Sequence, residues 1–239
     1  MTLDIEGAQP VRRHGARIIG SVPPVVKTNL RCKPLFLLKR PLWLASGSAY
    51  RRELLSRLGQ PFSWRSPDVD ESRRPGEAPA ALAGRLARAK AQAVAGALAA
   101  EAAQGTDADP GALVIGSDQV CALGDECLGK PGSAAAQAAQ LARLAGQRVV
   151  FHTAVCIVSL ADGFEAAHLD ETVCEFRTLT PAEIDAYVAA EPAYDCAGGF
   201  KCEGLGISLL DRLRAEDPTA LVGLPMIWVA RTLRPWTTR

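Results

Sequence analysis

The sequence predicts an α/β domain in which a mixed β-sheet carries helices on both faces. Short apolar runs alternate along the chain with longer segments of helical periodicity, and this alternation is typical of the class. The β-branched run 149–160 is joined through Asp162-Gly163 to a second run, 165–176, which predicts an antiparallel hairpin. The hairpin favours a mixed sheet over a purely parallel one.

The first half of the domain predicts a strand, a capped helix, a strand with a loop, and a long helix. Residues 42–45 form a short apolar run that indicates a buried strand. The serines that follow are good N-caps, because a serine oxygen accepts the unpaired amides of a first helical turn, and Gly59 ends that helix. Prolines and acidic residues over 60–76 indicate a strand and a loop. The alanine-rich segment 79–103 predicts a helix with an inward stripe of Leu82, Leu86, Ala89 and Ala93.

The second half contains the remaining strands and helices. Residues 112–116 predict a buried strand that ends at 117–119, and a second alanine-rich helix runs from a Ser133 cap to Gly146. The segment 180–183 combines an N-cap threonine, a proline at the first helical position and a glutamate three residues after the cap, which predicts a helix start. Closing helices are expected after two further dipeptides, Asp217-Pro218 and Leu224-Pro225.

Composition sets bounds on what the protein can bind. Its 239 residues suffice for a substantial core, and 48% apolar with 22% charged residues is ordinary for a globular chain. The formal net charge of +1 provides no basic field for long nucleic acid or an anionic membrane. No stretch reaches the ~18 apolar residues that span a bilayer. The seven cysteines include no CxxC pair, which indicates reduced thiols in a cytoplasmic protein.

The N-terminal part differs in character from the rest of the chain. Residues 1–38 carry several prolines and scattered arginines without an apolar period. An apolar run over 34–49 begins too late, and contains too many charges, to be a signal peptide. We therefore interpret residues 1–38 as a variable or disordered extension and residues 39–239 as the folded domain.

The most informative stretch is 194–210, which contains four glycines with Lys201 and Glu203 among them. Glycine permits positive φ and lets backbone approach a ligand closely, and the two charged side chains could read a polar ring or a phosphate. Plain turns would account for the same glycines.

Two other polar clusters follow predicted strands. Ser46 and Ser48 at a helix start present free amides and the positive end of the helix dipole, and Arg51 adds donors suited to phosphate oxygens. An ordinary capped helix with solvated arginines fits the same residues. Asp118 follows the strand 112–116, where ligands bind in open α/β sheets, and its carboxylate could bind Mg²⁺ or accept a proton from water. Its alternative role is to cap a turn.

Two lysines are candidate phosphate cations. Lys130 lies in a stiff loop between Gly129 and Pro131, and the helical periodicity places Lys90 on an exposed face. A nearby acidic trio could share a divalent ion or simply be solvated: Asp68, Asp70 and Glu71.

Seven blocks, in this order, resemble the Maf family of nucleoside triphosphate pyrophosphatases, and they cover residues 42–234. The blocks are Leu-Ala-Ser-Gly-Ser-x-x-Arg-Arg at 44–52, Asp-Val-Asp-Glu at 68–71, Arg-Leu-Ala-Arg-Ala-Lys-Ala at 85–91, Ile-Gly-Ser-Asp-Gln-Val at 115–120, Gly-Lys-Pro at 129–131, Cys-Ala-Gly-Gly-Phe-Lys-Cys-Glu-Gly-Leu-Gly at 196–206 and Asp-Pro-x-Ala-Leu-Val-Gly-Leu-Pro at 217–225. Seven ordered blocks are far more specific than any single one, so they favour the chemical interpretations over the structural alternatives.

The resemblance implies a Maf/ITPase-like fold, with a mostly elongated, twisted sheet and a central nucleotide cleft. It implies hydrolysis of a nucleoside triphosphate between the α and β phosphorus atoms, a divalent cation (Mg, Mn or Co), a cytoplasmic location and often a homodimer. By motif position, Asp118 matches the proton acceptor, and Glu71 is the second expected metal ligand. The expected substrate-binding residues are Ser46, Ser48, Arg51, Lys90, Lys130 and Lys201.

Substrate choice in the family follows three positions, which here are Tyr50, Gln119 and Glu203. An aromatic, a glutamine and a glutamate resemble the branch that acts on 7-methyl-GTP, although Tyr50 replaces the usual tryptophan and Ala49 the usual proline. N7 methylation makes guanine cationic, so an aromatic ring can stack on it and a carboxylate can accept its N–H groups. The alternatives are a dTTP or UTP pyrophosphatase of the same family, and a nucleotide-binding regulator of cell division at the septum.

Overall fold

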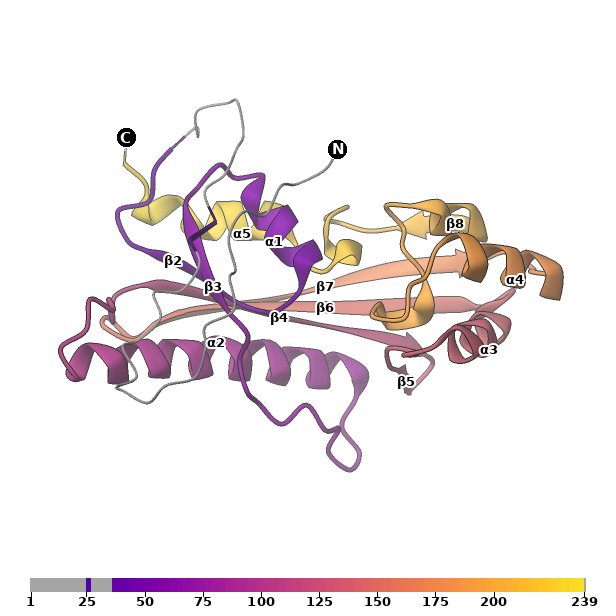
Figure 1. The fold of residues 1–239 in the computed structure, drawn as a ribbon, viewed down its shortest axis with the longest axis horizontal. Coiled ribbons are helices and arrows are strands. Elements are labelled where there is room, and N and C mark those ends of the chain that lie inside the picture. The colour runs from indigo at the N-terminus through magenta and orange to yellow at the C-terminus, as the bar shows by residue number, and fades with distance from the viewer. Residues whose placement is uncertain (1–24, 27–35, 239) are drawn as a thin grey trace, which may run out of the picture.

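A computed structural model describes residues 25–26 and 36–238 of the chain. Within these residues the strands form one mixed, eight-stranded sheet, long and twisted in Figure 1. In sheet order the strands are β1 (Val25–Val26), β3 (Phe62–Arg65), β2 (Leu42–Ala45), β4 (Leu113–Leu123), β6 (Arg148–Ser159), β7 (Phe164–Phe176) and β8 (Leu210–Arg214), with β5 (Glu126–Leu128) paired to β4 off this path. Only β2 pairs in parallel, with β3 and β4, and the other pairs are antiparallel.

Helices cover both faces of the sheet, as the sequence predicted. They are α1 (Ala49–Ser56), α2 (Pro79–Ala103), α3 (Ala134–Leu144), α4 (Pro181–Ala190) and α5 (Met226–Leu233), with 3-10 turns η1 (Ala197–Gly199), η2 (Leu205–Leu209), η3 (Ala220–Val222) and η4 (Arg234–Trp236). Helix α2 runs along one face, α1 and α5 lie on the other, and α3 and α4 gather at one end (Figure 1). The described helices include none that is long and apolar enough to cross a membrane.

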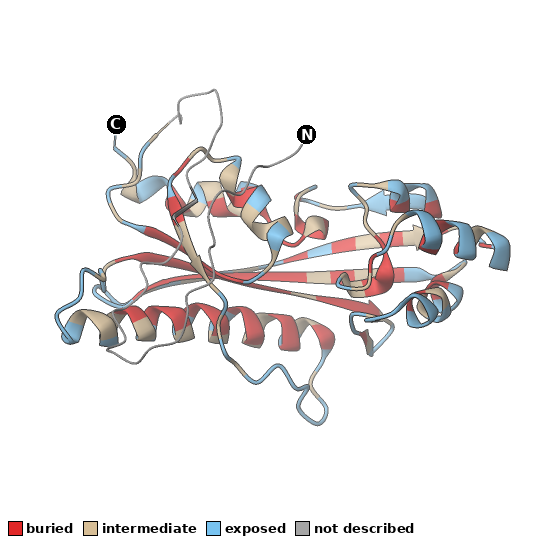
Figure 2. Cartoon of the chain, viewed as in Figure 1, coloured by how far each residue is buried: buried red, intermediate tan, exposed pale blue. Residues whose placement is uncertain are grey.

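Apolar side chains bind each helix to the sheet, and the strands between the helices are largely buried (Figure 2). Leu86 and Val94 of α2 belong to the cluster on one face, while Leu55 of α1 and Val229 of α5 belong to the cluster on the other. A third cluster at the end with α3 and α4 includes Phe200, from the glycine-rich loop. The predicted α/β fold with helices on both faces is therefore confirmed.

Capping side chains mark the starts of α1, α3 and α4. The Ser48 hydroxyl accepts the backbone N–H of Arg51 at the start of α1, and Ser133 caps α3 in the same way. Thr180 and Glu183 form the predicted reciprocal capping box of α4. Each cap satisfies an amide that the helix itself leaves without a partner.

Three expectations were wrong in detail. Strand β4 continues to Leu123, so Asp118 lies in mid-strand instead of beyond its end; its backbone pairs with Ala154 of β6. The short strands β5 and β8 were not predicted, because three to five residues carry little periodicity. The first closing segment is the 3-10 turn η3 and not an α-helix.

Most of the predicted N-terminal extension, residues 1–24 and 27–35, lies outside the described residues. Val25 and Val26 pair with β3 at the edge of the sheet. Leu38, the last residue of the proposed extension, forms a β-bridge with Thr237. The division into an extension (1–38) and a domain (39–239) stays a prediction.

Candidate active site

The site begins with an unusually close contact between helix α2 and strand β4. Gly116 lies on β4 beneath α2, and a Cβ there would meet the carbonyl oxygen of Ala87 and come within 2.5 Å of the Ala91 nitrogen. Only glycine allows this approach. The approach brings Lys90, on the next turn of α2, to Asp118, two residues further along β4.

Lys90 and Asp118 form a buried ion pair. The Lys90 Nζ donates to Asp118 Oδ1 at 2.6 Å, and the two side chains are 9% and 11% exposed. The sequence placed Lys90 on an exposed helix face, and this was wrong. The expected inward stripe was out of phase in its second half, because the buried face of α2 continues from Leu86 through Lys90 to Val94 and leaves Ala89 and Ala93 half-buried. Asp118 on the underlying strand provides a partner for the buried charge.

A second carboxylate reaches the same ammonium group. Glu71, from the loop between β3 and α2, lies 2.6 Å from Lys90 Nζ, although its own side chain is 60% exposed. Partial burial would raise the pKa of Glu71, but the hydrogen bond and charge of Lys90 hold it below the usual value. The other members of the acidic trio, Asp68 and Asp70, take no part in this contact.

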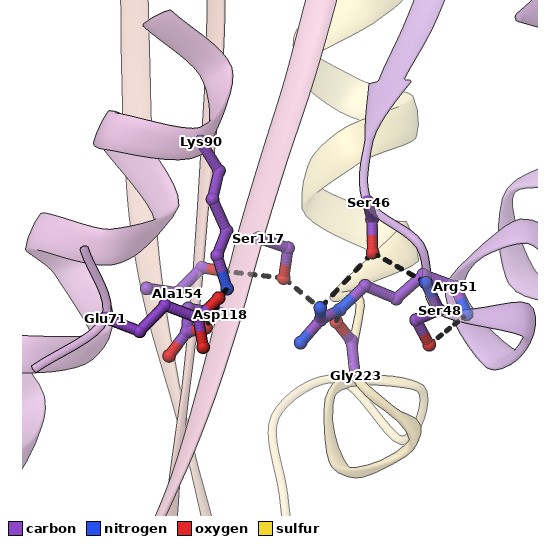
Figure 3. Close-up of polar contacts among 9 residues, drawn as sticks. All are labelled: Ser46, Ser48, Arg51, Glu71, Lys90, Ser117, Asp118, Ala154 and Gly223. Carbon is purple, nitrogen blue, oxygen red and sulfur yellow. Dashed lines mark hydrogen bonds and ion pairs between the residues drawn. The ribbon is translucent and has the colours of Figure 1, made fainter. Parts of the chain in front are cut away.

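On the other side of β4, Arg51 is held by hydrogen bonds from two directions (Figure 3). Its Nε donates to the Gly223 carbonyl at 2.8 Å, and its Nη1 lies 3.4 Å from the Ser46 hydroxyl. Burial lowers the pKa of Arg51, while Asp118 and Glu71 act to raise it. A guanidinium stays protonated under these conditions, so Arg51 presents a fixed positive charge.

One cleft of about 400 Å³ joins these groups to most of the other predicted residues. Its predicted site residues include Ser48, Tyr50, Arg51, Glu71, Lys90, Asp118, Gln119, Lys130 and Glu203. Residues distant in sequence therefore converge, and the cleft has a charged end near Lys90 and Arg51. Two predicted residues do not line it. Ser46 lies behind Arg51, and Lys201 donates through Nζ to the Pro192 carbonyl at 2.8 Å.

The three predicted specificity positions, Tyr50, Gln119 and Glu203, line the same cleft. Tyr50, from the first turn of α1, faces the glycine-rich loop that contributes Glu203. The Lys201 Nζ lies 5.7 Å from the centre of the Tyr50 ring. Burial raises the pKa of Tyr50, and burial of Lys201 is outweighed by its contact with Tyr50, so that the pKa of Lys201 is raised as well.

The glycines of this loop also serve the packing of the protein itself. A Cβ at Gly206 would lie 2.5 Å from the Lys201 carbonyl oxygen. The Glu191 carboxylate accepts the backbone N–H groups of Leu205 and Gly206, and it also accepts the Tyr187 hydroxyl. Glu191 therefore fixes the backbone of the glycine-rich loop at Leu205 and Gly206, and no motif in the sequence predicted this role.

Cysteines near the cleft are protonated thiols at neutral pH. Burial raises the pKa of Cys196 to about 11 and that of Cys202 to about 12. None of the described cysteines forms a disulfide. A thiol is a weak nucleophile compared with a thiolate, so the raised pKa values do not favour a reactive role for Cys196 or Cys202.

Glu71 and Asp118, the two predicted ligands of a divalent cation, are the cleft carboxylates that contact Lys90. Among the described residues, no three His, Cys, Asp or Glu side chains are grouped closely enough to hold a metal by themselves. Mg²⁺ commonly binds one or two carboxylates together with substrate phosphates and waters, and two carboxylates that meet at one ammonium group fit this requirement.

Comparison with known proteins identifies the family. The family profile described as Maf-like protein matches residues 41–236. The chain belongs to the Maf family. All seven blocks recognised in the sequence fall within the matched region, and so does every residue that lines the cleft.

Three similar relatives carry the name "7-methyl-GTP pyrophosphatase". A protein from Xanthomonas oryzae pv. oryzae (strain MAFF 311018) is 56% identical over 193 residues, which are 81% of this chain and 95% of that protein. A protein from Bordetella pertussis is 52% identical over 193 residues, 80% of this chain and 90% of the relative. One from Albidiferax ferrireducens is 50% identical over 197 residues, 82% and 94% of the two chains.

Proposed function

We infer that this Maf protein hydrolyses 7-methyl-GTP to 7-methyl-GMP and pyrophosphate, and so removes a modified nucleotide from the pool. The observation that carries the inference is the convergence, in one cleft, of the charged cluster around Lys90 and the Tyr50, Gln119 and Glu203 positions. The relatives at 50–56% identity carry the name of this activity.

The charged end of the cleft suits a triphosphate. A triphosphate brings about four negative charges, and the attacking water must approach phosphorus through them. Arg51 and Lys130 present cations to the phosphate oxygens, and Ser48 adds the start of α1 beside them. In this proposal Arg51 does not need to reorganise on binding, because the Gly223 carbonyl already fixes its Nε.

Asp118 is the proposed general base. Its carboxylate accepts the proton of the water that attacks the α phosphorus, and the bond to the pyrophosphate oxygen breaks as the new P–O bond forms. Lys90 holds one carboxylate oxygen of Asp118 through the 2.6 Å contact and so orients the group. Positioned general bases contribute on the order of 10²–10⁴ in rate.

A divalent cation is part of the proposal, with Glu71 and Asp118 as its protein ligands. When bound, it would neutralise charge on the phosphate oxygens and on the leaving pyrophosphate. Mg²⁺, Mn²⁺ and Co²⁺ are all compatible with oxygen ligands of this kind.

Base recognition is assigned to the three specificity positions in the cleft. N7 methylation places a positive charge on guanine, so the Tyr50 face attracts the ring, and the Glu203 carboxylate accepts donors from its edge while balancing the charge. Arginine at position 50 would repel the same base.

A substrate panel tests the proposal directly. Pyrophosphate release is measured from 7-methyl-GTP, GTP, dTTP and UTP with Mg²⁺, Mn²⁺ or Co²⁺, and 7-methyl-GTP is expected to have the highest kcat/KM. If dTTP or UTP is preferred by tenfold or more, the base assignment fails and the alternative of a dTTP/UTP pyrophosphatase replaces it.

The proposed site of action is the cytoplasm, which the free described thiols support. A homodimer remains a prediction that sedimentation can test.

A further inference from the structure

The side-chain amide of Gln119 is already bonded within the protein. Its Nε2 lies 2.9 Å from the Leu221 carbonyl oxygen, 3.1 Å from the Ala220 carbonyl oxygen and 3.0 Å from the Thr153 hydroxyl. An amide nitrogen carries only two protons, so these acceptors occupy both of them. The donor half of Gln119 is therefore unavailable to a ligand.

The same contacts fix which way the amide points. Turning the amide over would place its oxygen against the Ala220 and Leu221 carbonyl oxygens, and two acceptors would then face each other without a proton between them. No described residue donates a hydrogen bond to the Gln119 Oε1, and Gln119 lines the cleft. Gln119 thus offers the cleft an acceptor.

Thr153 completes this arrangement from the neighbouring strand. Thr153 of β6 is the register partner of Gln119 on β4, and its side chain is fully buried. Its hydroxyl accepts from Gln119 Nε2 and donates to the Ala220 carbonyl at 3.0 Å. Thr153 therefore holds both the Gln119 amide and the Ala220–Leu221 turn in place against the sheet by hydrogen bonds.

We propose that Thr153 and the turn at Ala220–Leu221 determine base selectivity by locking Gln119 as a hydrogen-bond acceptor. This inference rests on the proposed function and deepens it. Thr153 is a positioning residue, because it acts through Gln119 and lies outside the cleft lining.

An acceptor-only edge discriminates between bases by their donor pattern. Guanine presents a ring N–H beside an exocyclic amine, so its donors meet the Gln119 oxygen and the Glu203 carboxylate. Uracil and thymine present one N–H between two carbonyl oxygens, and those oxygens would face acceptors. A site built to receive donors rejects partners that lack them, because buried acceptors are then left unpaired.

The chain just after this turn also contacts Arg51 and Ser117. A Ser117 variant can therefore serve as a control for the Thr153 variants. Two residues beyond Leu221, the Gly223 carbonyl accepts from Arg51 Nε at 2.8 Å. It also shares the single Ser117 hydroxyl proton, at 2.9 Å, with the Ala154 carbonyl at 2.8 Å. Ser117 and Gln119 are two residues apart on β4, so their side chains share one face of the strand. Ser117→Ala should therefore disturb Arg51 and affect every nucleotide alike.

The test compares Thr153→Val, which keeps the shape but removes the hydroxyl, with Thr153→Ser, which restores it. For Thr153→Val we expect the ratio of kcat/KM for 7-methyl-GTP over UTP to fall about tenfold, mainly through a higher KM for 7-methyl-GTP. Thr153→Ser should keep the ratio within about threefold of the wild type. Ser117→Ala should lower kcat for both nucleotides and leave the ratio unchanged.

Two results would overturn the proposal. One is a Thr153→Val enzyme with the wild-type ratio, and the other is an equal loss on 7-methyl-GTP and UTP, which would indicate a merely structural role. Folding is checked by thermal unfolding of each variant. A second measurement needs no variant: in ¹⁵N-labelled wild type, the Gln119 side-chain amide protons should exchange slowly with solvent both before and after 7-methyl-GMP is added, because the Thr153, Ala220 and Leu221 acceptors hold them in both states. A fast-exchanging amide would also refute the lock, whichever nucleotide proves to be the substrate.

Discussion

The Lys90 ammonium and the Asp118 carboxylate meet at 2.6 Å in the interior of the protein, and both side chains are nearly inaccessible to solvent. Neither charge would be stable there alone, since an isolated buried charge costs several kcal/mol. The pair therefore links the proposed chemistry to the stability of the fold, and variants of the two residues should separate these contributions.

Asp118→Asn should remove hydrolysis while the protein remains folded. The amide keeps the shape of the carboxylate but cannot accept the proton of water, so we expect kcat to fall by a factor on the order of 10² or more. Pyrophosphate release and thermal unfolding measure the two effects. Near wild-type turnover would contradict the role of Asp118.

Overproduction of the Asp118→Asn variant beside the wild type would also show whether any effect on cell division requires catalysis.

Lys90→Met should lower stability as well as activity. The substitution leaves Asp118 buried without a partner, and breaking a buried ion pair costs about 3–5 kcal/mol. Arg88→Met on the same helix is a matched control, because its pair with Glu165 is exposed and such pairs contribute about 0–1 kcal/mol. Denaturant unfolding of both variants gives the comparison. Equal losses of unfolding free energy in the two variants would contradict the predicted difference between the buried and the exposed pair.

Gly116→Ala should separate α2 from β4. The added methyl would lie 2.5 Å from the Ala91 nitrogen, so the helix must shift, and overpacking of this kind costs about 1–3 kcal/mol. Because Lys90 would move away from Asp118, activity should fall too. Gly84→Ala, on α2 with open space around its Cβ position, should instead be neutral or stabilising by up to about 1 kcal/mol. Activity and unfolding free energy are measured for both, and a fully active Gly116→Ala would contradict the close-contact argument.

Glu71 should make stability depend on pH in the acid range. Its pKa in the folded protein is held below the ordinary value of 4.5, so its contribution is present above that value and is lost as the pH falls through the folded-state pKa. The advantage of the wild type over Glu71→Gln should therefore shrink from pH 7 to pH 3. Since the side chain is 60% exposed, we expect no more than about 1 kcal/mol at pH 7. An advantage that grows on acidification would contradict this sign.

Tyr50→Arg should weaken binding of a cationic base. Replacing an attractive ring by a like charge is expected to raise the KM for 7-methyl-GTP about tenfold or more, with a smaller effect on UTP. Tyr50→Phe keeps the ring and loses only the hydroxyl near Lys201, so its KM should stay within about threefold of the wild type. If Tyr50→Phe is as impaired as Tyr50→Arg, the hydroxyl contact and not the ring is what matters.

Much of the site could be named in advance because its residues lie in short, ordered blocks. Asp118, Arg51 and Glu203 were recognised from such blocks, and the cleft joins all three. Other features of the site, such as the burial of Lys90, are not visible in any short stretch of sequence. The burial of Lys90 depends on Gly116 and Asp118, which are more than twenty residues away in the chain, and a lysine whose partner is not visible in the sequence is assigned to solvent.

The sequence by itself determined the order of most helices and strands, the caps of three helices and the set of polar residues from which a site could be built. These are local properties, set by side-chain periodicity and by hydrogen bonds over three or four residues. Only the tertiary structure decided what each polar group does. Gln119 gives its protons to a turn about a hundred residues later and keeps an oxygen for the cleft, because the pairing of β4 with β6 and the return of the chain at Ala220 put those acceptors beside it.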